Sequence, residues 1–158
     1  AASDVYKRQT LNSIEQEKLP VMISVRGEQY FDDVDPNATE LMTEGTLEQT
    51  EDGFLLSYQE TELTGMEGTL TTFEIGPGRV ILRRSGSVNS QMVFEEGRQH
   101  TSLYETPYGT ATVGLETQRY RSTLSEHGGE LEIGYVVDFD HAFVGRNQLK
   151  INITEQRG

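Results

Sequence analysis

Apolar and polar side chains alternate with a period of two along most of this chain, and this alternation constrains the fold more than any other feature. It is clear in the runs from Val21 to Arg26 and from Val80 to Arg84. A period of two is typical of β-strands that bury one face. Because turn signals separate such runs at intervals of about ten residues, the sequence predicts an all-β protein.

Short glycine-containing segments mark where the predicted strands end. Asp52-Gly53 is a hairpin signal, and Gly76-Pro77-Gly78 combines tolerance of positive φ with a proline that lacks an amide hydrogen. The strands predicted between such signals cover residues 21–26, 41–48, 54–63, a run ending at 75, 80–84, 88–95, 99–106, 110–116, 130–138 and 148–154.

Eight or more antiparallel strands bury one face either as two packed sheets or as a closed barrel, and closure also removes exposed strand edges. Many of the predicted strands carry polar residues on both faces, which favours a barrel with a partly polar lumen over a sandwich. We therefore predict a single antiparallel β-barrel domain over residues 20–158, with about 8–10 strands. The sandwich is the alternative.

The first residues of the chain are interpreted separately. Asp4-Val5-Tyr6-Lys7-Arg8-Gln9 resembles the translation of an adapter used in DNA sequencing, so residues 1–9 are predicted to be a non-native tail. A natural tail is the alternative. Residues 10–19 are predicted to be a short leader, with a helix possible only over Thr10 to Lys18.

Charge and composition exclude several classes of protein. The chain has 26 Asp and Glu against 13 Lys and Arg, a formal net charge of -13, which opposes binding to nucleic-acid phosphates. It has no cysteine, which excludes a disulfide scaffold, a thiolate metal site and a cysteine nucleophile. No apolar run approaches the roughly 18 residues of a membrane span. We expect a soluble, acidic, single-domain protein that binds neither nucleic acid nor membrane.

Polar and aromatic residues on faces predicted to line the barrel are the candidate ligand-binding residues, namely Tyr58, Glu60, Arg84, His100 and Tyr104. A charge that faces a low-dielectric interior needs a partner, so Glu60 and Arg84 are the expected ion pair. Together these side chains would orient a small molecule in the lumen. The alternative is that each lies in solvent near a barrel mouth, or that the pair is structural.

Two carboxylates offer the only hint of catalysis. Glu60 and Glu62 fall on one face of the predicted strand, roughly 7 Å apart at the backbone, a separation that glycoside hydrolysis permits. Acidic residues are so frequent in this chain that the pair is weak evidence for a reaction.

One segment resembles a calcium-binding loop. Asp33, Asp35, Asn37 and Glu44 occupy four of its ligand positions, but Ala38 stands where the loop needs glycine. An acidic hairpin loop is therefore the prediction, and the three histidines show no metal-ligand spacing. We expect neither a metal nor a cofactor.

Several longer segments resemble one known family. Residues 57–69, 88–95, 100–110 and 129–133 resemble the YwiB-like family of bacterial proteins, and the similarity covers roughly residues 20–155. The resemblance implies a calycin-like β-barrel, the architecture of lipocalins, in a small cytoplasmic bacterial protein. It implies no function, because the family has no agreed catalytic or binding residues and a fold does not define an activity.

Three functions are consistent with these observations. The first is binding of a small molecule in the lumen without catalysis, which small residues at lumen positions would allow; these are Gly45, Ser90, Ser102, Thr106 and Gly114. The second is a protein-interaction module whose barrel is filled by side chains. The third is a carboxylate-dependent enzyme. Either a monomer or a homodimer is compatible with each.

Overall fold

The computed structural model describes residues 18–30 and 37–156. These residues form ten strands and one short 3-10 helix. The elements are β1 (Leu19–Tyr30), β2 (Asn37–Gln49), β3 (Phe54–Gln59), η1 (Glu62–Thr64), β4 (Leu70–Gly76), β5 (Arg79–Ser85), β6 (Asn89–Glu95), β7 (Gln99–Thr106), β8 (Gly109–Ser122), β9 (Gly128–Phe139) and β10 (Ala142–Glu155).

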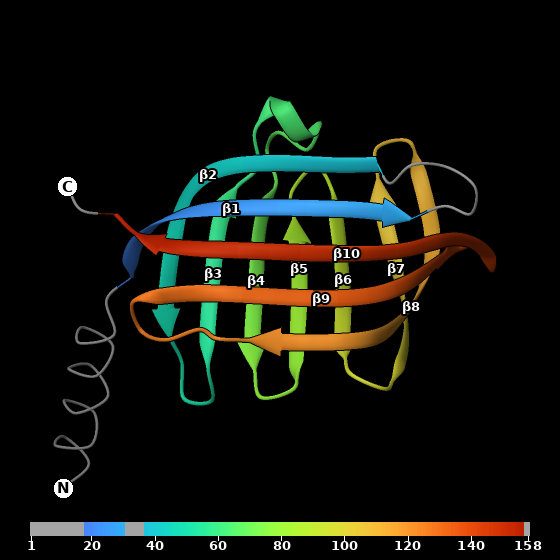
Figure 1. Ribbon diagram of the computed structural model, residues 1–158. Coiled ribbons are helices and arrows are strands. Elements are labelled where there is room, and N and C mark those ends of the chain that lie inside the picture. Colours follow the sequence, from blue (N-terminus) through green and yellow to red (C-terminus); the bar gives the residue numbers. More distant parts are fainter. Residues whose placement is uncertain (1–17, 31–36, 157–158) are drawn as a thin grey trace, which may run out of the picture.

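The ten strands form one closed antiparallel barrel. Each strand pairs with its neighbours along the chain, and β1 also pairs with β10 from Val21–Glu155 to Tyr30–Arg146, which closes the sheet. In Figure 1, β1, β9 and β10 cross the front of the barrel, and β3 to β6 run behind them at a steep angle. The predicted all-β barrel is confirmed, and the sandwich alternative is wrong.

One predicted strand is shorter than expected. β3 ends at Gln59, so Glu60 and Glu62 do not share a strand face, and that prediction is wrong. The chain instead turns into η1, where the Thr61 hydroxyl accepts a hydrogen bond from the amide of Leu63 at 3.3 Å. Gly65 ends η1 with a φ of 74°, a conformation that glycine adopts without strain.

Part of the barrel lumen is filled by apolar side chains. Leu47, Leu56, Phe73 and Leu82 are directly paired across β2 to β5, and all four are buried. A second row lies one step further from η1 and consists of Phe54, Ile75, Val80 and Phe94. We call these two rows the filled end of the lumen. Their buried apolar area supplies the main driving force for closing the barrel.

Some predictions fall on residues that the structure leaves undescribed. These are the tail over residues 1–9, the leader and helix up to residue 17, and the calcium-loop positions Asp33 and Asp35. Within the described part, Asn37 and Glu44 both belong to β2.

Candidate ligand-binding site

A row of polar residues follows the filled end on the side of the barrel that carries η1. In this polar row, Tyr58 pairs with Thr71, Thr71 with Arg84, Arg84 with Ser90 and Ser90 with Tyr104, across β3 to β7. Since residues two apart on a strand point to the same face, these side chains face the lumen like the apolar rows beside them. Three of the five predicted site residues therefore lie on one continuous row.

A cavity of about 570 Å³ lies at this end of the barrel, below the β3–β4 connection that stands above the strands in Figure 1. Tyr58, Glu60 and Arg84 line it. The other lining residues come from β1, β2 and the β3–β4 connection and are Val25, Thr39, Glu40, Leu41, Leu63, Thr64 and Met66. The cavity thus combines buried polar groups with an apolar wall, which is typical of small-molecule sites.

Glu60 is held in place by two hydroxyl groups. Thr64 donates to its Oε2 and Thr71 donates to its Oε1, each at 2.8 Å. The Glu60 side chain is buried, and its backbone amide donates to the Thr69 carbonyl at 2.9 Å. Because the carboxylate accepts these two hydroxyls, its orientation is fixed by the protein itself.

Arg84 has no comparable partner. Its Nε is buried without a hydrogen-bond acceptor, and the guanidinium forms no ion pair within the part of the chain that the structure describes. The direct ion pair predicted between Glu60 and Arg84 is therefore wrong. The Ser90 hydroxyl, on the residue paired with Arg84, is likewise buried without a partner. Two neighbouring donors thus point into the polar end of the lumen with no acceptor from the described residues.

The positive charge of Arg84 affects the pKa of two tyrosines, Tyr58 on β3 and Tyr135 on β9. Burial raises the pKa of Tyr58 well above its ordinary value of 10.0, Glu60 raises it further, and Arg84 acts in the opposite direction. Burial also raises the pKa of Tyr135 on β9, and Arg84 again opposes the shift. Both phenols therefore stay protonated at neutral pH and are available as hydrogen-bond donors.

Tyr135 belongs to a second, smaller cavity. This cavity has a volume of about 230 Å³ and shares Thr39 with the larger one. Asn147, paired with Tyr135, also lines it and is buried. The ring of Tyr135 meets Phe94 edge to face, with centroids 5.0 Å apart, so its orientation is fixed by a residue of the filled end.

The wall around η1 is tied to the neighbouring loop. The Thr69 and Ser87 hydroxyls lie 2.8 Å apart, and the amide of Val88 donates to the Thr69 hydroxyl at 3.1 Å. Ser87 also donates to the Glu67 carbonyl at 2.8 Å. These bonds fix the connection that carries Thr64 and Met66, because they link it to the loop between β5 and β6.

The structure does not bring His100 and Tyr104 into this cavity. His100 pairs with the lumen residue Leu115, but its Nε2 lies 3.2 Å from Oε1 of Glu95. Tyr104 belongs to the polar row, and its ring packs edge to face against Phe139 at 6.5 Å. The cavity therefore unites Tyr58, Glu60 and Arg84, while the other two predicted site residues lie elsewhere.

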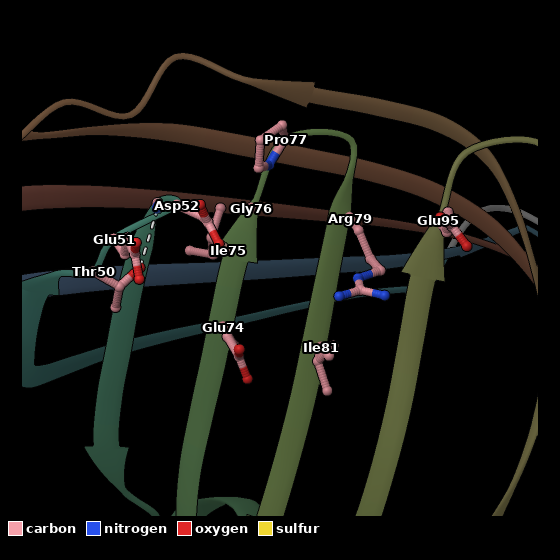
Figure 2. A pocket seen from close by; sticks show the side chains of 11 residues that line it. Thr50, Glu51, Asp52, Glu74, Ile75, Gly76, Pro77, Arg79, Ile81 and Glu95 are labelled. Carbon is pink, nitrogen blue, oxygen red and sulfur yellow. Dashed lines mark hydrogen bonds between the residues drawn. The ribbon is translucent and has the colours of Figure 1, made fainter.

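A second large cleft lies outside the lumen, at the opposite end of the strands. It has a volume of about 500 Å³ and is formed by the turns near Asp52 and Pro77 together with Glu74, Arg79 and Glu95 (Figure 2). Two of its carboxylates have neighbours that compensate them, since Glu74 forms an ion pair with Arg83 and Glu95 lies near Arg98 and His100. It is therefore a weaker candidate than the lumen cavity, where Arg84 is uncompensated.

Sequence reasoning missed several residues of the site. Thr71 and Tyr135 alternate in register with buried Phe73 and Ile133, so the period-two pattern could have placed them in the lumen. Thr64 and Met66 follow no such pattern, because they lie in an irregular connection whose path depends on tertiary contacts.

Among residues 18–30 and 37–156, no three His, Asp or Glu side chains converge in a way that could hold a metal ion. Over the same residues, no helix has the length and apolar character needed to cross a membrane.

Comparison with known proteins agrees with the barrel described above. No curated protein is significantly similar to this chain in sequence. The crystal structure of the YwiB protein from Bacillus subtilis matches it with a TM-score of 0.77 at 21% identity, over 92% of this chain and 99% of that one. This likeness shows a shared fold and confirms the resemblance to YwiB-like proteins. Residues 23–151 match the family described as "Domain of unknown function (DUF1934)", and the chain therefore belongs to the DUF1934 family.

Proposed function

We propose that this protein binds a small molecule in the cavity at the polar end of its lumen and does so without catalysis. The observation that carries the proposal is Arg84, a half-buried side chain that lines a cavity of about 570 Å³ and whose buried Nε has no acceptor among the described residues. Arginine stays charged at any physiological pH, so burying its Nε donor without an acceptor is unfavourable. A ligand that supplies an acceptor removes this penalty.

The apolar wall supports the same function. Leu41, Val25 and Met66 line the same cavity as the polar groups, and contact with the apolar part of a ligand would bury both surfaces. Glu62 is exposed on η1 and does not line the cavity, so the two carboxylates that suggested glycoside hydrolysis do not meet there. The residues are therefore better suited to binding than to chemistry.

A pair of adjacent residues on β2 provides the test. Leu41 lines the cavity, and Met42 is 60% exposed on the outer face. We expect Leu41→Trp to fill the cavity and Met42→Trp to leave it open. The probe is an anilinonaphthalene sulfonate dye, whose anionic group and apolar rings match the two kinds of wall.

The expected result is strong dye emission with the wild type and Met42→Trp, and its loss in Leu41→Trp. Native mass spectrometry of the purified protein gives the second readout, because a bound mass should be present in Met42→Trp and absent in Leu41→Trp. Equal dye binding by both variants, or none by the wild type, would overturn the proposal.

The second candidate function is a protein-interaction module. Leu47, Leu56, Phe73 and Leu82 fill part of the lumen, as such a module requires. The outer surface would then carry the function, and Met42→Trp would impair it while Leu41→Trp would not. Pull-down of the same protein partner by the wild type and Leu41→Trp, with loss in Met42→Trp, would favour this candidate.

We also propose that the protein acts in the bacterial cytoplasm as a monomer or homodimer. A fold that contains no cysteine needs no oxidising compartment, and the structural relative YwiB is a bacterial protein. Cell fractionation and light scattering of the purified protein test these two points.

A further inference from the structure

The walls of the lumen cavity hold one cationic and one acidic side chain that are not paired with each other. Arg84 lies on β5, and Glu60 follows β3, with Thr71 of β4 between them. Thr71 donates to Glu60, so the strand that separates the two groups also holds the carboxylate in place. A ligand in this cavity therefore meets two fixed groups of opposite character.

The Arg84 side of the cavity requires a hydrogen-bond acceptor. Arg84 Nε and Ser90 Oγ are buried without partners on directly paired residues, and both groups can donate. A carboxylate matches arginine best, because its two oxygens can accept from two donors in one plane.

The Glu60 side of the cavity offers further acceptor capacity. Each Glu60 oxygen accepts one threonine hydroxyl, whereas a carboxylate has about four acceptor positions in total. The hydroxyl groups of Tyr58 and the threonines are donors here, and the carboxylate still has acceptor positions left. A ligand can fill these positions only with a further hydrogen-bond donor. An ammonium group supplies three such donors.

Charge balance decides between ligand classes. A purely anionic ligand would add negative charge to a cavity that Glu60 and Glu40 both line, and a purely cationic ligand would lie near Arg84. A zwitterion satisfies both sides and adds no net charge to a low-dielectric site. Its remaining part would contact the apolar wall formed by Val25, Leu41, Leu63 and Met66.

We propose that the ligand is a small amino carboxylate with an apolar side chain, whose carboxylate binds Arg84 and whose ammonium group binds Glu60. This inference rests on the proposed lumen binding and names its ligand class.

The test uses isothermal titration calorimetry on the full chain with matched sets of three probes. Leucine, methionine and phenylalanine are each compared with the acid that lacks the amine and the amine that lacks the carboxylate. We expect at least one amino acid to bind about tenfold or more tightly than both of its analogues, since each analogue lacks one of the two charged contacts.

Two variants assign the groups. Arg84→Gln should weaken the amino acid about tenfold or more and leave binding of the amine analogue nearly unchanged. Glu60→Gln should also weaken binding of the amino acid, but it should leave binding of the acid analogue nearly unchanged. Arg83→Gln and Glu62→Gln are the matched controls on exposed neighbours, and both should bind like the wild type. Circular dichroism checks that each variant folds, and the wild-type probe comparison needs no variant.

The outcomes separate this inference from the proposed function. If an acid analogue binds as tightly as its amino acid, or if no probe binds while the dye still does, the zwitterion is wrong and lumen binding stands. If the dye also fails to bind the wild type, the proposed function itself is wrong.

Discussion

The two ends of the lumen are built on the same strands but from opposite kinds of residue. On β4 and β5, Phe73 pairs with Leu82 at the filled end, and two residues further along Thr71 pairs with Arg84 at the polar end. The first pair belongs to the hydrophobic core, whereas the second contains a buried Nε without an acceptor. A distance of roughly 7 Å along the strands therefore separates a folding core from a candidate site.

The difference shows how a barrel can divide its interior between stability and binding. Apolar burial at the filled end favours the folded state, while uncompensated polar groups at the other end oppose it. Sites prepared for a ligand are commonly less stable than the scaffold around them. Removing an apolar side chain at the filled end should therefore destabilise the fold, whereas removing the unpartnered donor of Arg84 at the polar end should stabilise it.

The largest effect is expected at the filled end. Phe73→Ala should lower the free energy of unfolding by about 3–5 kcal/mol, because it leaves a cavity among buried neighbours. Urea unfolding followed by circular dichroism measures the change. Leu70→Ala, at a partly exposed position on the same strand, is the control and should cost far less. Equal losses in both variants would contradict a core centred on Phe73.

At the polar end, Thr71→Val should cost about 1–3 kcal/mol, because it keeps the shape of the side chain and removes a donor to the buried Glu60. The neighbouring Thr72→Val faces outward and should change the unfolding free energy little. The same urea titration measures both. A neutral Thr71→Val would mean that its hydroxyl does not support the carboxylate.

Replacement of Arg84 should have the opposite sign. Arg84→Met removes a buried donor that lacks an acceptor and keeps an unbranched side chain, so stability should rise by about 1 kcal/mol. Arg83→Met removes an exposed ion pair with Glu74 and should lower stability slightly or leave it unchanged. A loss of stability in Arg84→Met would show that the guanidinium is compensated in the free protein.

The smallest effect concerns alkaline pH. The pKa of Tyr58 and that of Tyr135 are raised on folding by burial, so their contribution to stability is complete below the ordinary value of 10.0. It is lost as the pH rises through the folded-state values, because the unfolded chain releases its protons first. Unfolding free energies measured in steps above pH 10.0 should fall, and less steeply in Tyr58→Phe. An unchanged slope in that variant would contradict the burial of the phenol.

Much of the barrel could be predicted from the sequence, because strand alternation and turn residues are local signals. Side chains two residues apart on a strand point to the same face, and this local rule assigned Tyr58, Arg84 and Tyr104 to faces that line the lumen. The register of the strands places the three residues on one row. Sequence reasoning failed where the chain leaves regular structure. Thr61 and Gly65 end the strand pattern, so Glu60 lies beyond β3 and Glu62 on η1.

His100 illustrates a different limit. His100 lies on the face of β7 that the alternation predicts, since it pairs with buried Leu115. However, β6 and β7 pair only at Asn89–Glu105 and Ser90–Tyr104. The two strands are not paired between these positions and the turn that joins them, and beside that turn the His100 ring contacts Glu95. No local pattern encodes where two strands separate.

The sequence by itself determined that this chain forms antiparallel strands, where most of them turn, and which residues alternate toward the interior. These properties follow from side-chain periodicity and turn chemistry, which act over a few residues. Only the tertiary structure decided that Glu60 binds two threonines, that the buried Nε of Arg84 lacks an acceptor, and that Tyr135 of β9 lies within the influence of the Arg84 charge. Those relations depend on barrel closure and on the path of one connection, which bring together residues far apart in the chain.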